Sequence, residues 1–201
     1  KFSTAREITI GSANVLAARI GYVGELGFEL HIPTEYASHV YNVLWSAGQS
    51  ENIANVGYRA IESLRMEKGY LYWSSDITPD HTPFEAGVGF RVHLNSKEDF
   101  VGRDALEKQN LTGLSKKLCT FTCDNDLSVT GGEAILLNDK VVSLATSASY
   151  GYSVKKTILR GYLEKEHWEE VNFYLEVFGE RYPIHRVNSP IYDPTNQALK
   201  T

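Results

Sequence analysis

One stretch of the chain contains residue types that could form a small-molecule site. Residues 21–29 hold three glycines within seven positions and lead into a strand. Side chains alternate between the faces of a strand, so Glu29 points away from the face shared by Phe28 and Leu30. Because glycines let a ligand approach the backbone, this carboxylate could accept two hydrogen bonds from an amino-bearing heterocycle, and Tyr22 could offer a ring for stacking. The spacing alone, however, favours a plain strand-loop-strand with solvated carboxylates.

Other polar and aromatic residues have simpler structural explanations. Trp73 could wall a binding site, but core packing explains it equally well. Arg65 and Glu67 are two positions apart on a predicted helix, so they do not face each other, and we expect Arg65 to anchor a neighbouring loop. Asp76 and Glu85 are better explained by loop capping or a salt bridge than by a paired-carboxylate site. The six histidines have no metal-binding spacing.

Composition excludes several classes of function. The formal net charge of −5 and a pI of about 5.7 have the wrong sign for a surface that binds nucleic acid. No apolar run approaches the roughly 20 residues of a membrane-spanning helix.

Cys119 and Cys123 would lie about 13 Å apart on one strand face, which is too far for a disulfide. We therefore expect two buried, reduced thiols and a reducing soluble compartment, the cytoplasm or the mitochondrial matrix. The sequence has no Gly-x-Gly-x-x-Gly motif after a predicted strand, so we expect no flavin or nicotinamide site within these residues.

The elements that position these residues follow two patterns. In the first half, two short strands around Gly11 and the strand after the glycines precede a helix that Thr34 can cap and Gly48 closes. A second helix is predicted over 57–68, a strand over 89–94 and a short helix over 102–109. From about Gly113 the pattern is of short strands joined by turn residues. The predicted strands cover residues 116–123, 133–137, 140–148, 159–163, 171–178 and 181–187.

These patterns predict an α+β chain in two parts. Six short strands without an intervening helix indicate a small antiparallel β-barrel or sandwich. The polar link at 110–115 predicts a boundary between residues 1–112 and a barrel domain over 113–201.

Four blocks of residues occur in the order of one family's motifs. They are Gly21-Tyr22-Val23-Gly24-Glu25-Leu26-Gly27-Phe28-Glu29, Ser63-Leu64-Arg65-Met66-Glu67-Lys68-Gly69, Thr82-Pro83-Phe84-Glu85 and Asp99-Phe100-Val101-Gly102-Arg103-Asp104-Ala105-Leu106. They resemble the aminomethyltransferase, or T-protein, family of the glycine cleavage system. Lys68 and Trp73 further resemble the folate-binding tail of sarcosine and dimethylglycine dehydrogenases. The resemblance implies the C-terminal half of a folate-binding domain followed by a small antiparallel β-barrel.

The resemblance also implies roles for individual residues. Glu29 matches the glutamate that holds the pterin ring of tetrahydrofolate, Tyr22 matches a tyrosine of the folate site, and Trp73 is a further candidate for its wall. The family's arginine falls on Ile61, and its tyrosine near the C-terminus falls close to Gln197, so two contacts of the T-protein cannot be made here. The family's catalytic aspartate belongs to the N-terminal half, so no catalytic residue is assigned.

The implied function is one-carbon transfer from a small N-methylated amine to tetrahydrofolate within a longer enzyme. These residues would be inactive and would bind folate weakly by themselves, and FAD would be a cofactor only if an upstream domain exists. Two alternatives stay open. One is a regulatory module related to the regulatory subunit of pyruvate dehydrogenase phosphatase, without folate chemistry. The other is a stand-alone aminomethyltransferase.

Overall fold

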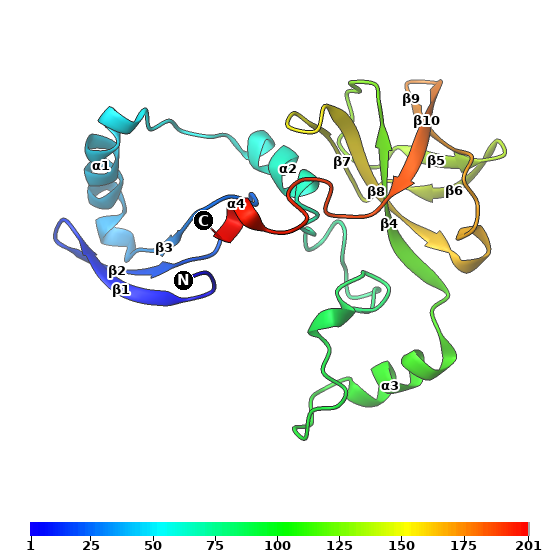
Figure 1. The fold of residues 1–201 in the computed structure, drawn as a ribbon, viewed down its shortest axis with the longest axis horizontal. Coiled ribbons are helices and arrows are strands. Elements are labelled where there is room, and N and C mark those ends of the chain that lie inside the picture. Colours follow the sequence, from blue (N-terminus) through cyan, green and yellow to red (C-terminus); the bar gives the residue numbers. More distant parts are fainter. Residues whose placement is uncertain (201) are drawn as a thin grey trace.

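The N-terminal part is a small antiparallel sheet with one helix that rises from one end of it (Figure 1). The computed structural model describes residues 1–200. Strands β1 (Ala5–Ile10), β2 (Ala13–Ala18) and β3 (Glu29–His31) pair in the order β1-β2-β3, and Gly11 makes the first turn with a φ of +61°. Helix α1 (Ala37–Ala47) buries Val40 against Ala13 and Val15 (Figure 1). The predicted strands around Gly11 and the helix that ends at Gly48 are confirmed.

Two local predictions in this part are wrong. Strand β3 begins only at Glu29, so Phe28 does not share a buried strand face with Leu30. Leu30 packs on the small core, while Phe28 is 57% exposed beneath the guanidinium of Arg19. Thr34 does not cap the helix, since it begins a 3-10 turn (Thr34–Tyr36) and neither this turn nor α1 has a side-chain cap.

Helix α2 (Tyr58–Glu67) lies between the two sheets in Figure 1 and buries Ser63, Arg65, Met66 and Glu67. Further on, a short 3-10 turn (Gly89–Arg91) replaces the predicted strand over 89–94. Hydrogen bonds within the turn, from Val92 N to Gly89 O and from Arg91 N to Val88 O, use backbone groups that a strand would offer to a neighbour. The predicted short helix is present as α3 (Arg103–Thr112).

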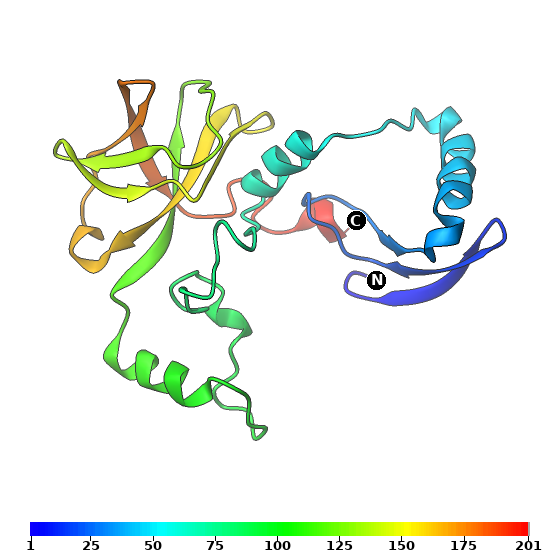
Figure 2. The ribbon, with the colours of Figure 1, turned by 180° about the vertical axis from the view of Figure 1, so that it is seen from behind.

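The remaining strands form one curled antiparallel sheet, the predicted small barrel, whose order is β6-β5-β9-β10-β4-β8-β7 (Figure 2). Its strands are β4 (Lys116–Cys123), β5 (Ala134–Leu137), β6 (Lys140–Leu144), β7 (Ser147–Gly151), β8 (Lys156–Glu164), β9 (Phe173–Val177) and β10 (Glu180–Val187). Phe121, Leu159, Phe173 and Leu175 lie at the centre of its core. Cys119 and Cys123 are free and buried, as predicted.

The predicted strand over 140–148 is two strands, because the chain changes partner in its middle. β6 pairs with β5, and β7 pairs with β8. At the change, Ala145 N donates to Glu133 O and Thr146 N donates to Arg160 O. The chain therefore passes from one edge strand of the sheet to the other at Ala145 and Thr146.

After β10 the chain leaves the barrel and returns to the end of α2. The backbone N–H groups of Ile191 and Tyr192 both donate to Glu67 O, and the short helix α4 (Gln197–Lys200) follows. The hydroxyl of Tyr192 donates to Glu25 Oε1 at 2.6 Å, so this segment also contacts the glycine-rich loop. The boundary between residues 112 and 113 stays a prediction.

Candidate functional site

The glycine-rich loop is held against the segment that follows α2. A Cβ at Gly24, where φ is +81°, would lie 2.8 Å from the Cδ and Cγ atoms of Lys68. Lys68 is itself fixed, because its Nζ donates to the carboxylate of Asp193 at 2.8 Å. Gly24 therefore allows the glycine-rich loop and the segment after α2 to approach each other closely.

Tyr22 lies inside this contact. Its hydroxyl donates to Leu71 O at 2.7 Å, and its ring stacks on Tyr70 with centroids 5.8 Å apart. Burial raises the pKa of Tyr22, and the positive charge of Arg65 opposes the shift. Both the hydroxyl and one ring face are thus used within the chain, so only the remaining ring surface is available to a ligand.

Glu29 and Trp73 lie at the surface. Glu29 is the first residue of the edge strand β3, opposite Ala18, and its exposed side chain makes no hydrogen bond or ion pair with another residue of 1–200. Trp73 is 64% exposed in the loop after α2. The structure thus does not gather Glu29, Tyr22 and Trp73 into one enclosed pocket, and their folate roles stay predictions.

Asp76 lies at the centre of a buried cluster of charged and polar side chains, which sequence analysis identified only in part. The Asp76 carboxylate is fully buried and accepts from Arg65 Nη1 at 2.6 Å, from Arg160 Nη1 at 3.2 Å and from Thr146 Oγ1 at 2.7 Å. Burial alone would raise the pKa of Asp76, but the charge of Arg160, the Thr146 hydroxyl and the charge of Arg65 together hold it below its usual value. Asp76 therefore stays ionised and joins the loop after α2 to the barrel.

Two predictions about this region are confirmed. Arg65 anchors a loop, because its Nη1 also donates to Tyr70 O at 3.1 Å. Glu85 serves as a local cap, since its Oε2 accepts from Thr82 N at 2.9 Å. Sequence reasoning missed Arg160. The available signal was an arginine inside the apolar run of β8, where both strand faces are buried.

Further hydrogen bonds fix α2 to the barrel. Ser63 Oγ donates to Tyr150 O at 2.7 Å, and Ser153 N donates to Glu67 Oε1 at 2.7 Å. Arg65 and Glu67 accordingly have different partners, as their spacing predicts. The helix is therefore held by polar contacts at both strand β7 and the turn that follows it.

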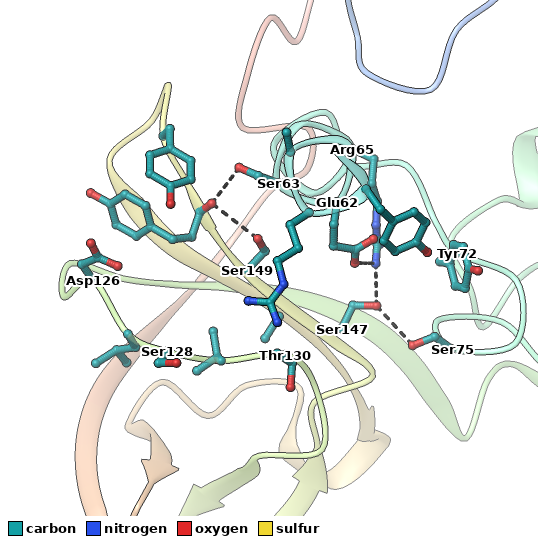
Figure 3. A pocket seen from close by; sticks show the side chains of 18 residues that line it. Glu62, Ser63, Arg65, Tyr72, Ser75, Asp126, Ser128, Thr130, Ser147 and Ser149 are labelled. Carbon is teal, nitrogen blue, oxygen red and sulfur yellow. Dashed lines mark hydrogen bonds and ion pairs between the residues drawn. The ribbon is translucent and has the colours of Figure 1, made fainter. Parts of the chain in front are cut away.

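An open cavity of about 880 Å³ lies between α2 and the barrel. Figure 3 shows Glu62, Arg65 and Ser147 on one side of it and Asp126, Ser128 and Thr130 on the other. Its lining combines hydroxyl groups, the rings of Tyr58 and Tyr72 and charges of both signs, which suits a polar organic molecule. None of the three predicted folate residues lines it. Within residues 1–200 no group of His, Cys, Asp and Glu could hold a metal ion, and no helix is long and apolar enough to cross a membrane.

Comparisons with known proteins identify the family. A family model described as the GCVT N-terminal domain matches residues 1–96, and one described as the glycine cleavage T-protein C-terminal barrel domain matches residues 116–193. The crystal structure of the glycine cleavage system aminomethyltransferase T from Bartonella henselae is similar with a TM-score of 0.82 and 25% sequence identity, over 94% of this chain and 52% of that chain. The prediction of an α+β, T-protein-like fold with a small barrel is confirmed.

Two curated relatives represent different kinds of protein. The chain is 38% identical over 207 residues to the mitochondrial sarcosine dehydrogenase of Homo sapiens, covering 99% of this chain and 22% of the relative. It is 41% identical over 164 residues to the mitochondrial pyruvate dehydrogenase phosphatase regulatory subunit of Mus musculus, covering 79% of this chain and 19% of the relative. The chain thus spans about a fifth of the length of these relatives. By its two domain matches and its fold, the chain belongs to the glycine cleavage T-protein family.

Proposed function

We propose that this chain is the tetrahydrofolate-binding part of an aminomethyltransferase-like or sarcosine dehydrogenase-like protein. In that protein it supports transfer of a one-carbon unit from an N-methylated amine to tetrahydrofolate. The observation that carries the proposal is the free carboxylate of Glu29, at the end of a glycine-rich loop with the sequence pattern of the T-protein family. Tetrahydrofolate, when bound, supplies the nitrogen atoms that accept the one-carbon unit.

The carboxylate of Glu29 suits the donor pattern of the pterin ring of tetrahydrofolate. An amino-bearing pteridine offers adjacent N–H donors, and a carboxylate without a partner in its own chain can accept both. Glu29 meets this requirement, since no other residue of 1–200 occupies its oxygens. Tyr22 would contribute only ring surface, because its hydroxyl donates to Leu71 O, and Trp73 has an exposed indole for stacking.

Other parts of the protein would supply the remaining chemistry. A flavin would belong to an upstream domain, as would the site for the N-methylated amine. Because the relatives described above are mitochondrial proteins, we place this one in the mitochondrial matrix. The two free, buried cysteines are compatible with that reducing compartment.

The second candidate is a regulatory module without folate chemistry. It is supported by 41% identity to the phosphatase regulatory subunit and by Ile61, which stands where the T-protein has an arginine. An isoleucine cannot donate hydrogen bonds, so one ligand contact of the T-protein is lost. A folate-binding measurement separates the two candidates directly.

The test is calorimetric titration of the full-length protein with tetrahydrofolate. Glu29→Ala leaves the pterin donors without a charged acceptor, so folate affinity should fall by about 1.5–3 kcal/mol, roughly 10-fold to 150-fold. Glu35→Gln is the matched control, because Glu35 is also an exposed glutamate but lies outside the motif. Unchanged affinity in Glu29→Ala would remove Glu29 from the site, and the absence of folate binding in the wild-type protein would favour the regulatory module.

A further inference from the structure

The glycine-rich loop has no framework of backbone hydrogen bonds. Within residues 1–200, the backbone groups of residues 20–28 form no hydrogen bond with another backbone group. Side chains hold the loop instead: the hydroxyl of Tyr22 donates to Leu71 O at 2.7 Å, and Arg19 Nη1 donates to Gly27 O at 3.4 Å. A segment with so few bonds opens locally at little cost, so each further contact to it matters.

A third side-chain hydrogen bond to this loop comes from the chain that follows the barrel. The hydroxyl of Tyr192 donates to Glu25 Oε1 at 2.6 Å, which is the shortest of the three bonds and joins residues 167 positions apart. Glu25 is half-buried and forms no ion pair within residues 1–200. The two glutamates of the motif therefore differ, because Glu25 is engaged within the chain whereas Glu29 is free.

The segment that carries Tyr192 is itself firmly attached to the end of α2. The backbone N–H groups of Ile191 and Tyr192 donate to Glu67 O at 3.1 and 3.0 Å. Lys68 Nζ donates to the carboxylate of Asp193 at 2.8 Å and to its carbonyl oxygen at 2.7 Å. We call residues 191–193 the C-terminal strap. Because its backbone is fixed, the strap gives the Tyr192 hydroxyl a defined position from which to hold the loop.

We propose that Tyr192 is a positioning residue for Glu29 and acts through Glu25. The bond fastens the middle of the loop to the C-terminal strap, and Glu29 is the first residue after that loop. A binding group that is already held in place loses less freedom when the ligand arrives, so affinity rises without a new contact to the ligand. The ligand role of Glu29 rests on the proposed function, but the fastening of the loop does not.

Three variants of the full-length protein test this role. Tyr192→Phe removes the donor and Glu25→Ala removes the acceptor, whereas Glu25→Gln keeps an oxygen that can accept the bond. Tyr182→Phe is the matched control. The hydroxyl of Tyr182 also donates to a glutamate, Glu180 Oε2, at 2.6 Å, but this pair belongs to the barrel strand β10.

The first measurement is the rate of chymotrypsin cleavage after Phe28 in the absence of folate, followed by mass spectrometry. Phe28 is 57% exposed, so cleavage reports how often the loop opens. We expect cleavage about fivefold faster in Tyr192→Phe and in Glu25→Ala, near the wild-type rate in Glu25→Gln, and unchanged in Tyr182→Phe. Cleavage after Phe178, which is 92% exposed in the barrel, is the internal reference and should not change in any variant.

The second measurement is tetrahydrofolate affinity by calorimetry. Tyr192→Phe should lower it about fivefold in the wild-type background and leave it unchanged in the Glu29→Ala background, because Tyr192 acts only through Glu29. A purely structural role for Tyr192 would lower affinity equally in both backgrounds. Tyr182→Phe should have no effect in either.

The proposal is overturned if Tyr192→Phe leaves the cleavage rate after Phe28 unchanged, if Tyr182→Phe accelerates it equally, or if the loss of affinity persists in Glu29→Ala. The proposed function fails separately, when the wild-type protein does not bind tetrahydrofolate. In that case the cleavage rates alone decide whether the C-terminal strap holds the loop.

Discussion

Replacing Asp76 with asparagine should show how far the buried charge cluster stabilises the fold. The substitution keeps the shape of the side chain and removes its charge. Arg65 and Arg160, each 1% exposed, would then face a neutral amide at distances of 2.6 and 3.2 Å. Arg65 retains Glu62 as a charged partner, but Arg160 has no other carboxylate partner among residues 1–200.

The expected cost follows from the burial of these groups. Removing one partner of a buried ion pair typically costs 3–5 kcal/mol, because the remaining charge stays out of water without compensation. The asparagine Oδ1 can still accept one hydrogen bond, which places the expected loss of unfolding free energy near 3 kcal/mol. For a chain of this length that is a decrease in Tm of about 6–12 °C.

The measurement is urea unfolding at pH 7, followed by circular dichroism and tryptophan fluorescence. Urea is preferable to guanidinium chloride, which would screen the charges under test. Asp124→Asn is the control, since Asp124 pairs with Lys156 at 2.7 Å but the two side chains are 74% and 43% exposed. It should cost less than about 1 kcal/mol. If Asp76→Asn cost no more than Asp124→Asn, the cluster would not be a major source of stability.

Two further outcomes follow from the same region. The folded-state pKa of Asp76 is lowered, so the stability from its charge should be fully present above pH 4 or so and be lost as the pH falls through that lowered pKa. The difference in unfolding free energy between the wild-type protein and Asp76→Asn should therefore shrink only in acid, and a difference that stayed constant down to pH 2 would contradict this. Gly24→Ala should destabilise the chain by about 1–3 kcal/mol, because φ is +81° and the new Cβ would meet Lys68. Gly21→Ala, with no atom closer than 3.9 Å, should cost clearly less in the same unfolding assay, and equal losses would refute the argument.

Elements with strong local signals were predictable from the sequence. The apolar periodicity of residues 57–68 predicted helix α2, and the turn glycines predicted the short strands of the barrel, and the structure confirms both. The predictions failed where long-range pairing decides the outcome. Residues 140–148 alternate like one strand, yet Thr146 N pairs with Arg160 O and divides them into β6 and β7. Residues 89–94 have strand-like composition but pair with no strand in the described part of the chain, and Gly89–Arg91 forms a turn.

The candidate site was less predictable because its contacts join distant parts of the chain. The glycine-rich motif indicated Glu29 and Tyr22, but the stacking of Tyr22 on Tyr70 depends on a loop almost 50 residues away. Arg160 had no motif at all. Its role arises only when β8 lies beside the loop that carries Asp76, and no spacing along the sequence encodes that proximity.

The same contacts connect the glycine-rich loop to the barrel through a short chain of bonds. Tyr22 is held by Leu71 O and by the ring of Tyr70, whose carbonyl accepts from both Arg65 and Arg160. Arg160 is part of strand β8, so the position of the loop that precedes Glu29 depends on the barrel as well as on its own sheet. Since a binding residue must be held to within a fraction of an ångström to be effective, a substitution at Arg160 should alter ligand binding at Glu29 without touching the ligand. Comparing the effect of Glu29→Ala in the wild-type protein and in Arg160→Lys tests this dependence, because strictly additive losses would mean that the two positions act independently.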